Sequence, residues 1–515
     1  MRMLKVVLHL FSLMTLSHLY ANADSVKEPC YTKLSEVLGC FIQHPAGPAH
    51  LTRLSTLSED KLRVEAYSFD SQTWPIEADA DIPATVWKHK LVFYIPDQIL
   101  HNTVLLYVGG GYNQDSEGKN EGFQEYKEQL DFRKIALRNQ AVVVDLQAVP
   151  NQFLFMGGKY RREDQFLAYT YKKLMTDPMK NAYLAGHLPM AKAIVRAMDR
   201  IETVLEQERQ VTKLRFLLAG ASKRGWAVWL AALEDSRVEA IVPIVIDVLN
   251  TQKSMNHICQ VYKGCPFAFK DYAEEKLTSQ LTSQAFADLM KIEDPFNYLG
   301  SDYDPQYRER LGIPKLIINA SGDDFFVPDS SQWYFKALPG AANYIRYLPN
   351  SLHYFRGNPI SNATRSHSAI NAAVDTYFGF ILKQTALPKI QWSFAKDSIE
   401  LSSSVKPQSI KLSTAFNKQR DFRFVNRHTT WHLKIKGLLS YILSDVCDTC
   451  YVEREIPVTC STEGECKIQV PLTAASEETW RASFLEVHYQ IGDQDFVVST
   501  EVSVEFLAHH THKEL

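Results

Sequence analysis

Apolar runs of strand length alternate with helical segments from about residue 63 to residue 348, and this alternation limits the possible folds more than any other feature of the sequence. The later runs are continuously apolar, as central parallel strands covered on both faces are. The pattern predicts a doubly wound, mainly parallel α/β sheet, and the first strands, which lack long helical crossovers, predict an antiparallel meander leading into it. The strand-like runs are residues 63–69, 90–95, 103–108, 141–146, 214–219, 240–246, 315–320 and 344–348. The helical segments are residues 131–140, 163–175, 190–208 and the stretch after Ser222.

The sequence pattern changes after about Pro388. Short alternating strands with turn residues between them are predicted, and no convincing helix competes with them. They are residues 390–394, 398–404, 409–416, 430–437, 466–474 and 482–506. Because 515 residues are too many for one ordinary core, two domains are expected. We predict a doubly wound domain over residues 24–387 and a smaller C-terminal β-sandwich, of immunoglobulin or fibronectin type, over residues 388–515.

The first 23 residues have the three parts of a secretory signal peptide: basic Arg2 and Lys5, an apolar run over residues 6–19, and the cleavage sequence ANA over residues 21–23. A membrane anchor is the alternative, but a bilayer span needs roughly 20 apolar residues, which is longer than this run. No later segment is long and apolar enough to span a membrane, so no span is expected after cleavage. The ending HKEL loosely resembles an ER-retention signal, with Lys513 where such signals carry Asp. The prediction is a secreted or periplasmic protein.

All eight cysteines lie beyond the predicted cleavage site, and an even number in an exported chain predicts disulfides. Cys30 with Cys40 and Cys259 with Cys265 are the natural local pairs. A later cluster allows three pairings, and it consists of Cys447, Cys450, Cys460 and Cys466. A four-cysteine zinc site is one alternative for this cluster. A redox-active CxxC pair is another, although the strand-then-helix context of such motifs is missing.

Composition and charge argue against nucleic acid as a partner. Hydrophobic residues make up 45% of the chain and charged residues 22%, with a formal net charge of -3. No basic run of the kind that follows phosphates is present. The histidines near the C-terminus, His509, His510 and His512, are a weak metal-binding candidate and more simply a frayed tail. No cofactor or metal is predicted.

The stretch LLAGASKRGWAVWLAAL, residues 217–233, begins as a buried strand, turns through small residues at Ser222 and continues as a helix. A serine hydroxyl has too high a pKa to attack a carbonyl unaided, so it needs a base, a group that orients the base, and donors for the oxyanion. In α/β-hydrolases the serine stands on such a turn in the pattern G-x-S-x-G. Gly220 has the expected place here, and Gly225 comes one position late. Ser222 is therefore the predicted nucleophile, with a helix-capping serine as the alternative.

The acid and the base of such a site follow later strands, in the chain order serine, acid, histidine. The loop after residues 315–320 supplies Asp323 and Asp324, and Asp323 is preferred because the residues after it resemble the corresponding loop of many hydrolases. Asp247, which ends the run over residues 240–246, is a third candidate, and any of the three has a turn or cap role as its alternative. His353 lies just past the strand-like run over residues 344–348, where the topology places the base.

Three glycines, Gly109, Gly110 and Gly111, directly follow the strand-like run over residues 103–108, as in the HGGG-type loops of esterases. Glycines there let backbone N–H groups approach a substrate closely. We expect Gly110 and Gly111 to contribute to the oxyanion site, with the N–H of Lys223 as the second donor. A flexible turn is the alternative.

Eight stretches together resemble a known family, the PhoPQ-activated pathogenicity-related proteins, which includes a secreted autocrine proliferation repressor. They are VPNQFLF, REDQFLAYTY, LPMAKAIVRAMD, GASKRGWAVWLAAL, VPIVIDVLN, DPFNYL, GDDFFVPDSS and YLPNSLHYF, within residues 74–355. The resemblance implies the α/β-hydrolase fold, a secreted or periplasmic setting, and Ser222, Asp323 and His353 as triad positions. The substrate of the family is not established. The arrangement G-x-S-[KR]-x-G also resembles glucuronoyl esterases, which implies that the charge of Lys223 helps to hold the oxyanion and suggests a sugar ester.

Two functions follow from these residues. The first is an exported serine hydrolase, esterase or peptidase-like, that cleaves an ester or amide in a small-molecule, peptide or glycan substrate through an acyl-enzyme. The second is a catalytically inactive signalling or binding protein on the same scaffold. The off-pattern elbow and the appended sandwich, a candidate contact for a cell-surface partner, favour the second.

Overall fold

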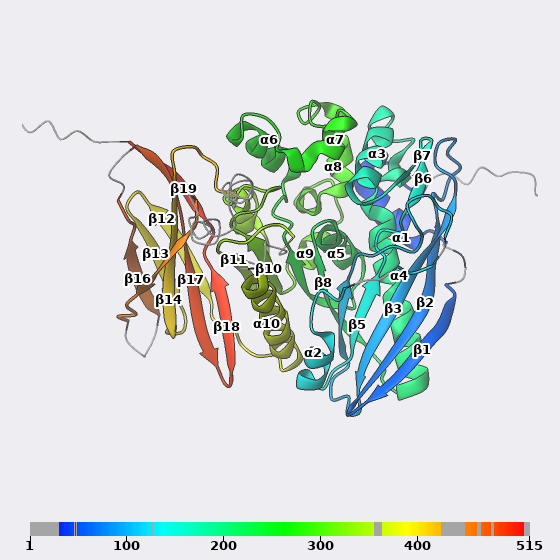
Figure 1. Ribbon diagram of the computed structural model, residues 1–515, viewed down its shortest axis with the longest axis horizontal. Coiled ribbons are helices and arrows are strands. Elements are labelled where there is room, and N and C mark those ends of the chain that lie inside the picture. Colours follow the sequence, from blue (N-terminus) through cyan, green and yellow to red (C-terminus); the bar gives the residue numbers. More distant parts are fainter. Residues whose placement is uncertain are drawn as a thin grey trace, which may run out of the picture.

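A nine-stranded sheet forms the centre of the molecule, in the order β1-β2-β3-β5-β4-β8-β9-β10-β11 (Figure 1). The computed structural model describes residues 30–508 apart from residues 46, 48, 121, 125–126, 355–362, 424–448, 461–464 and 475–477. From β1 to β5 neighbouring strands run antiparallel, and from β5 to β11 they run parallel. The predicted α/β sheet with its antiparallel meander is therefore confirmed. The strands are β1 (Leu51–Glu59), β2 (Leu62–Trp74), β3 (Thr85–Pro96), β4 (Thr103–Val108), β5 (Val143–Gln147), β8 (Arg215–Ala221), β9 (Val238–Ile244), β10 (Lys315–Ala320) and β11 (Asn343–Leu348).

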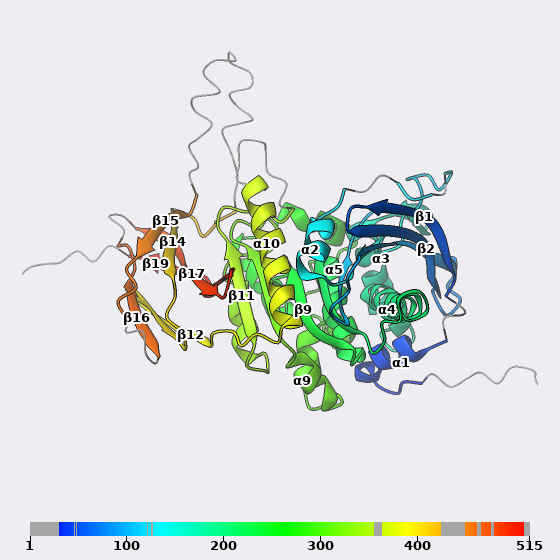
Figure 2. The same ribbon diagram turned by 90° about the horizontal axis from the view of Figure 1, so that it is seen from below.

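Helices cover both faces of this sheet (Figure 2). α2 (Phe132–Asn139) and α10 (Ala363–Leu382) lie on one face, and α3 (Glu163–Thr176), α4 (His187–Arg209) and α5 (Lys223–Glu234) lie on the other. Successive residues of β4 alternate between the two cores: Leu105 packs with the α2 side, and Leu106 with the α4 and α5 side. Burial on both faces explains why the central strands are continuously apolar.

Short helices between β9 and β10 lie over the carboxyl ends of the parallel strands, next to α3 (Figure 1). We call α6 (Thr251–Val261), η3 (Phe267–Phe269), α7 (Lys270–Glu274) and α8 (Gln284–Glu293) the cap helices. They are followed by η4 (Pro295–Leu299) and α9 (Gln306–Leu311). The sequence pattern did not predict the cap helices, and they enclose one side of the candidate site.

The C-terminal part consists of two antiparallel sheets. β12 (Ile390–Ala395), β13 (Ser398–Ser403) and β16 (Cys466–Pro471) form the first sheet. β15 (Val452–Ile456), β14 (Ser409–Asn417), β17 (Thr479–Ile491) and β18 (Gln494–Ser499) form the second, with β19 (Ser503–Leu507) paired to β17. Leu401 and Val470 of the first sheet share a buried core with Leu412 and Val487 of the second, as in a β-sandwich. The strand expected over residues 430–437 lies outside the described residues.

The sandwich packs on the last strand of the nine-stranded sheet. β18 lies beside β11 and α10 (Figure 1). The backbone N–H of Tyr347 in β11 donates to Ser499 Oγ at 2.9 Å. The ring of Phe496 lies edge-on to Tyr344, with centroids 5.1 Å apart, and also contacts Phe380 of α10 at 5.7 Å. The sandwich thus covers a strand edge that exposes unpaired backbone groups when it is bare.

Three disulfides lie within the described residues: Cys30–Cys40, Cys259–Cys265 and Cys460–Cys466. The first two are the local pairs that the sequence predicted. Cys450 is also disulfide-bonded, and Cys447 lies outside the described residues. In the part of the chain that the structure covers, no group of three or more His, Cys, Asp or Glu side chains is arranged to hold a metal. The predicted signal peptide and the C-terminal histidines fall outside that part.

The described helices include α4, with 23 residues, and α10, with 20 residues. None of them combines the length and the hydrophobicity that a membrane crossing needs.

Candidate active site

Ser222 occupies the turn between β8 and α5, at the carboxyl end of the central parallel strands. Its backbone has φ 57° and ψ −131°, a conformation that favours glycine and is held here by surrounding contacts. One such contact is the N–H of Ser222, which donates to the carbonyl of Ile244 at 2.7 Å. The turn places the serine side chain at the sheet edge. Ser222 makes no side-chain cap hydrogen bond to α5, so it does not have the role of a helix-capping serine.

Gly220 and Gly225 pack against each other across this turn. A Cβ on Gly225 would lie 2.7 Å from the carbonyl oxygen of Gly220, and a Cβ on Gly220 would lie 3.0 Å from backbone atoms of Arg224. Both positions therefore exclude larger side chains. The glycine that seemed one position late in the sequence is the one that the first turn of α5 brings against β8.

The structure brings Ser222, His353 and Asp323 together. His353 follows β11, and its Nε2 lies 2.9 Å from Ser222 Oγ. On the other side of the ring, His353 Nδ1 lies 2.9 Å from Asp323 Oδ2. The carboxylate of Asp323 is fixed in turn, because its Oδ1 accepts the backbone N–H groups of Phe325 at 2.7 Å and Phe326 at 3.2 Å. The ring of Phe325 also packs on the imidazole, with centroids 4.4 Å apart.

The two other aspartates named as candidate acids have different surroundings. Asp247 accepts hydrogen bonds from the hydroxyls of Tyr334 at 2.7 Å and Tyr347 at 2.5 Å. Burial raises the pKa of Asp247 to about 8. Burial also raises the pKa of Asp324, and the charge of neighbouring Asp323 adds to this effect. Of the three candidate acids, Asp323 is the one whose carboxylate is hydrogen-bonded to His353 within the described residues.

The glycine loop after β4 lies beside Ser222. The N–H of Gly109 donates to Leu146 O at 2.8 Å, and the carbonyl of Gly110 accepts the N–H of Ala148 at 2.7 Å. A Cβ on Gly110 would lie 2.8 Å from Arg224 Nη2, and Gly111 has φ 112°. Gly110 and Gly111 line the same cleft as Ser222 and Lys223. The N–H of Lys223 belongs to the first turn of α5, where backbone donors have no partner inside the helix.

Two basic residues that directly follow Ser222 form ion pairs with acidic residues of α3. The sequence analysis did not identify these acidic residues. Lys223 Nζ lies 3.0 Å from Glu163 Oε2 and 3.3 Å from Asp164 Oδ2. Arg224 Nη2 lies 2.5 Å from Glu163 Oε1. Burial alone disfavours the charge of Glu163, but the charges of Arg224 and Lys223 outweigh it and lower the pKa of Glu163. The ammonium of Lys223, expected to act on an oxyanion, is therefore compensated by two carboxylates.

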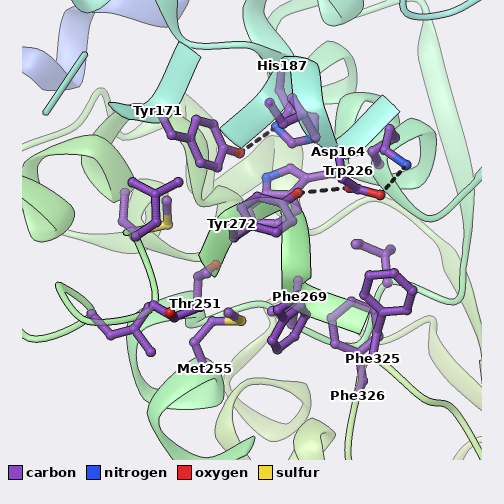
Figure 3. A pocket seen from close by; sticks show the side chains of 18 of the residues that line it. Asp164, Tyr171, His187, Trp226, Thr251, Met255, Phe269, Tyr272, Phe325 and Phe326 are labelled. Carbon is purple, nitrogen blue, oxygen red and sulfur yellow. Dashed lines mark hydrogen bonds and ion pairs between the residues drawn. The ribbon is translucent and has the colours of Figure 1, made fainter. Parts of the chain in front are cut away.

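Two cavities meet at Ser222 and Lys223. The first is a polar cleft, which is lined by His353, the glycine loop and the charged side chains of Lys127, Arg162 and Lys270. The second is an apolar pocket that extends under the cap helices (Figure 3). The arrangement can hold a substrate across the serine, with chemically different groups on its two sides.

The sequence profile of the family described as PhoPQ-activated pathogenicity-related protein matches residues 38–423, well over half of the chain. The chain belongs to this family. The match extends beyond residues 74–355, where the sequence stretches indicated it. It includes the elbow, the glycine loop, the cap helices and the first strands of the sandwich.

One curated relative in the comparison is the autocrine proliferation repressor protein A of Dictyostelium discoideum. It is 28% identical over 470 residues, which cover 88% of this chain and 86% of the relative. Among solved structures, the acetyl xylan esterase 1 of a Thermoanaerobacterium species has a TM-score of 0.41 at 14% identity, over 70% of this chain and 95% of that one. The glucuronoyl esterase of Solibacter usitatus has a TM-score of 0.34 at 13% identity, over 66% of this chain and 91% of that one. Structural likenesses this distant say nothing about what this family member acts on.

Proposed function

We propose that the protein is an exported serine hydrolase that cleaves an ester or amide through an acyl-enzyme on Ser222. The observation that carries the proposal is the continuous hydrogen-bonded series from Ser222 Oγ to His353 and from His353 to Asp323, each step 2.9 Å long. A serine that merely caps a helix has no need of a buried imidazole on its hydroxyl. The disulfides fit an oxidising compartment, in agreement with export.

In the acylation step, His353 takes the hydroxyl proton of Ser222 while Oγ attacks the carbonyl carbon. Asp323 holds the Nδ1–H of the ring, so that Nε2 faces the serine, and stabilises the imidazolium that forms. The N–H of Lys223 and the glycine loop, through Gly110 and Gly111, are the proposed donors for the negative oxygen. His353 then gives its proton to the leaving group. In deacylation, water attacks the acyl-enzyme with His353 again as the base.

The proposal is tested with a fluorophosphonate probe and a panel of activated esters on the purified protein. Wild type should bind the probe covalently and hydrolyse at least one ester. Ser222→Ala should lose the labelling, and its ester kcat/KM should fall by about 10⁴-fold or more. If wild type and Ser222→Ala behave alike toward the probe and the whole panel, the proposal is wrong.

A second candidate function is a signalling or binding role that needs no catalysis. It is favoured by the name of the Dictyostelium discoideum relative, an autocrine proliferation repressor, and by the sandwich, which offers a surface for a cell-surface partner. A proliferation assay with responsive cells separates the two functions. Full repression by Ser222→Ala would favour the binding role, and repression lost together with ester hydrolysis would favour the hydrolase.

A further inference from the structure

An apolar pocket opens directly beside Ser222, on the side of the cap helices (Figure 3). Its walls come from α3, the start of α4, α5, the cap helices and the loops after β9 and β10. Apolar side chains form most of its surface. They include Trp226, Met255, Phe269, Phe286, Phe325 and Phe326.

Several of the polar side chains in the wall of this pocket bind one another. The hydroxyl of Tyr272 donates to Asp164 Oδ1 at 2.9 Å, and the same carboxylate is paired with Lys223. The hydroxyl of Tyr171 lies 3.0 Å from His187 Nδ1, and Figure 3 shows both of these hydrogen bonds at the edge of the pocket. His187 Nε2 is buried without a hydrogen-bond partner among the described residues. Most of the other side chains that line the pocket are apolar, so the pocket presents mainly carbon atoms to a bound group, which favours an apolar occupant.

The position of the histidine assigns the two cavities to the two halves of a substrate. Among the described residues, His353 lines the polar cleft and is absent from the lining of the apolar pocket. A general acid must reach the atom that it protonates, so the leaving group has to lie on the His353 side of Ser222. The apolar pocket then remains for the acyl group. The cleft on the other side, with Lys127, Arg162 and Lys270, suits a polar leaving group.

The size of the pocket limits the acyl group. Its volume is ≈ 70 Å³. An apolar cavity of about 150 Å³ holds a benzene ring, so this pocket has room for a chain of about three carbons. Longer chains need the pocket to widen, at a cost in packing.

We propose that the substrate is an ester of a short apolar acid of about three or four carbons with a polar alcohol. This inference rests on the hydrolase function proposed above. Ser222 Oγ forms a bond to the acyl carbon as the bond to the alcohol oxygen breaks, and the alcohol leaves with the proton from His353. Water then releases the carboxylic acid and restores the serine.

The test is a series of 4-nitrophenyl esters from acetate to octanoate with the full-length protein. The leaving group is constant, so changes in kcat/KM report the acyl group. We expect the highest kcat/KM for propanoate or butanoate and a value lower by about tenfold or more for octanoate.

Two variants link this preference to the pocket. Phe269→Ala should enlarge the pocket and raise the kcat/KM for octanoate relative to that for butanoate by about tenfold. Met255→Phe should fill the pocket and lower the kcat/KM for butanoate relative to that for acetate by about tenfold. This second variant keeps the test valid if Phe269→Ala fails to fold. Phe267→Ala is the matched control, since Phe267 belongs to the same short helix and is 81% exposed.

The outcomes separate this inference from the proposed function. If Ser222-dependent hydrolysis is present and the folded variants keep the wild-type chain-length profile, the acyl-pocket inference is overturned and the hydrolase function stands. If no ester in the series is hydrolysed and the fluorophosphonate probe leaves Ser222 unlabelled, the hydrolase function itself fails.

Discussion

Two buried aspartates, Asp323 and Asp247, follow strands of the same sheet and have different partners. The carboxylate of Asp323 is hydrogen-bonded to His353, the histidine beside Ser222, while Asp247 accepts hydrogen bonds from two tyrosine hydroxyls. With a pKa raised by burial to about 8, Asp247 is largely neutral at pH 7. A carboxyl that stabilises an imidazolium must be ionised. The sequence left these residues as alternatives because both follow strands, and the positions of the side chains distinguish them.

Exchanging each of these carboxyl groups for an amide tests this assignment. Asp323→Asn should lower ester kcat/KM by about 10⁴-fold, because the amide no longer holds the imidazole in the required tautomer. Asp247→Asn, an equally buried exchange, should change kcat/KM much less. Steady-state kinetics on one activated ester measure both, and a larger loss in Asp247→Asn would contradict the assignment.

The raised pKa of Asp247 also predicts a dependence of stability on pH. The folded pKa of about 8 lies above the usual value of 3.8, so the folded state binds more protons between these two values. The contribution of Asp247 to the free energy of unfolding is fully present below pH 3.8. It is lost as the pH rises to about 8, by at most about 1.4 kcal/mol per pH unit.

Asp247→Asn should remove this contribution. Denaturant unfolding at several pH values between 4 and 8 should show the wild-type free energy of unfolding falling relative to that of the variant. Parallel curves for the two proteins would show that the Asp247 carboxyl ionises normally in the folded state.

At the scale of elements, the turn from β8 to α5 depends on close contact between a strand glycine and a helix glycine. Gly225→Ala would place a Cβ 2.7 Å from the carbonyl oxygen of Gly220, too close for a real contact. We expect a loss of about 1–3 kcal/mol in the free energy of unfolding, together with a loss of probe labelling, because the turn itself must move.

The control for this change is Gly39→Ala in α1 (Val37–Gln43). The nearest atom to a Cβ there is the side-chain hydroxyl of Tyr307 at 3.3 Å, a longer contact than that at Gly225 and not one with the backbone. Alanine also favours a helix more than glycine by about 1 kcal/mol, so stability should hold or rise. Equal destabilisation by both alanine variants, measured by denaturant unfolding, would contradict the close contact at the elbow.

The sequence predicted the elements that have strong periodicity. α2, α3, α4 and α5 and the strands from β2 to β11 of the main sheet lie where the patterns placed them, within a few residues. β1 was missed because Leu51, Leu54 and Leu57 recur every three residues, whereas a regular strand alternates every two. This edge strand is mostly exposed and has an irregularity between Arg53 and Ser55. The cap helices are short, and their packing partners are distant in the sequence.

The same contrast holds for the site. Chain order and strand ends predicted Ser222, His353 and three candidate aspartates, of which Asp323 was preferred because the residues after it resemble the corresponding loop of many hydrolases. The structure brings Ser222, Asp323 and His353 together. Their catalytic role stays a prediction until it is measured. The ion pairs of Glu163 were not predictable, because Lys223 and Arg224 lie about 60 positions away and no local pattern joins them. The boundary between the two proposed domains at residues 387 and 388 also stays a prediction.

At the scale of the whole molecule, the sandwich and the main sheet share buried residues. Phe496 of β18 is 2% exposed and contacts one ring on β11 and one on α10. Asn350, close to His353 in the chain, exchanges two hydrogen bonds with the backbone of Tyr451, at 2.8 and 3.0 Å. The loop that carries the candidate base is thus held partly by the C-terminal strands. This contact predicts that the two parts unfold together.

Phe496→Ala tests that coupling. The variant should lose about 3–5 kcal/mol of unfolding free energy, because a buried ring is replaced by a cavity. The transition should stay single, whether it is followed by circular dichroism or by loss of esterase activity. Phe506→Ala, at a ring that is 49% exposed, should cost much less. Two separate transitions, with activity surviving the first, would contradict the coupling.

Trapping the acyl-enzyme shows whether Ser222 is the nucleophile. Wild-type protein turning over 4-nitrophenyl butanoate is quenched in acid within the first turnovers, digested, and mapped by mass spectrometry. The account predicts a butanoyl group on Ser222, absent from Ser222→Ala. Product formation with Ser222 unmodified at every quench time, or an acyl group on another residue that persists in Ser222→Ala, would contradict it.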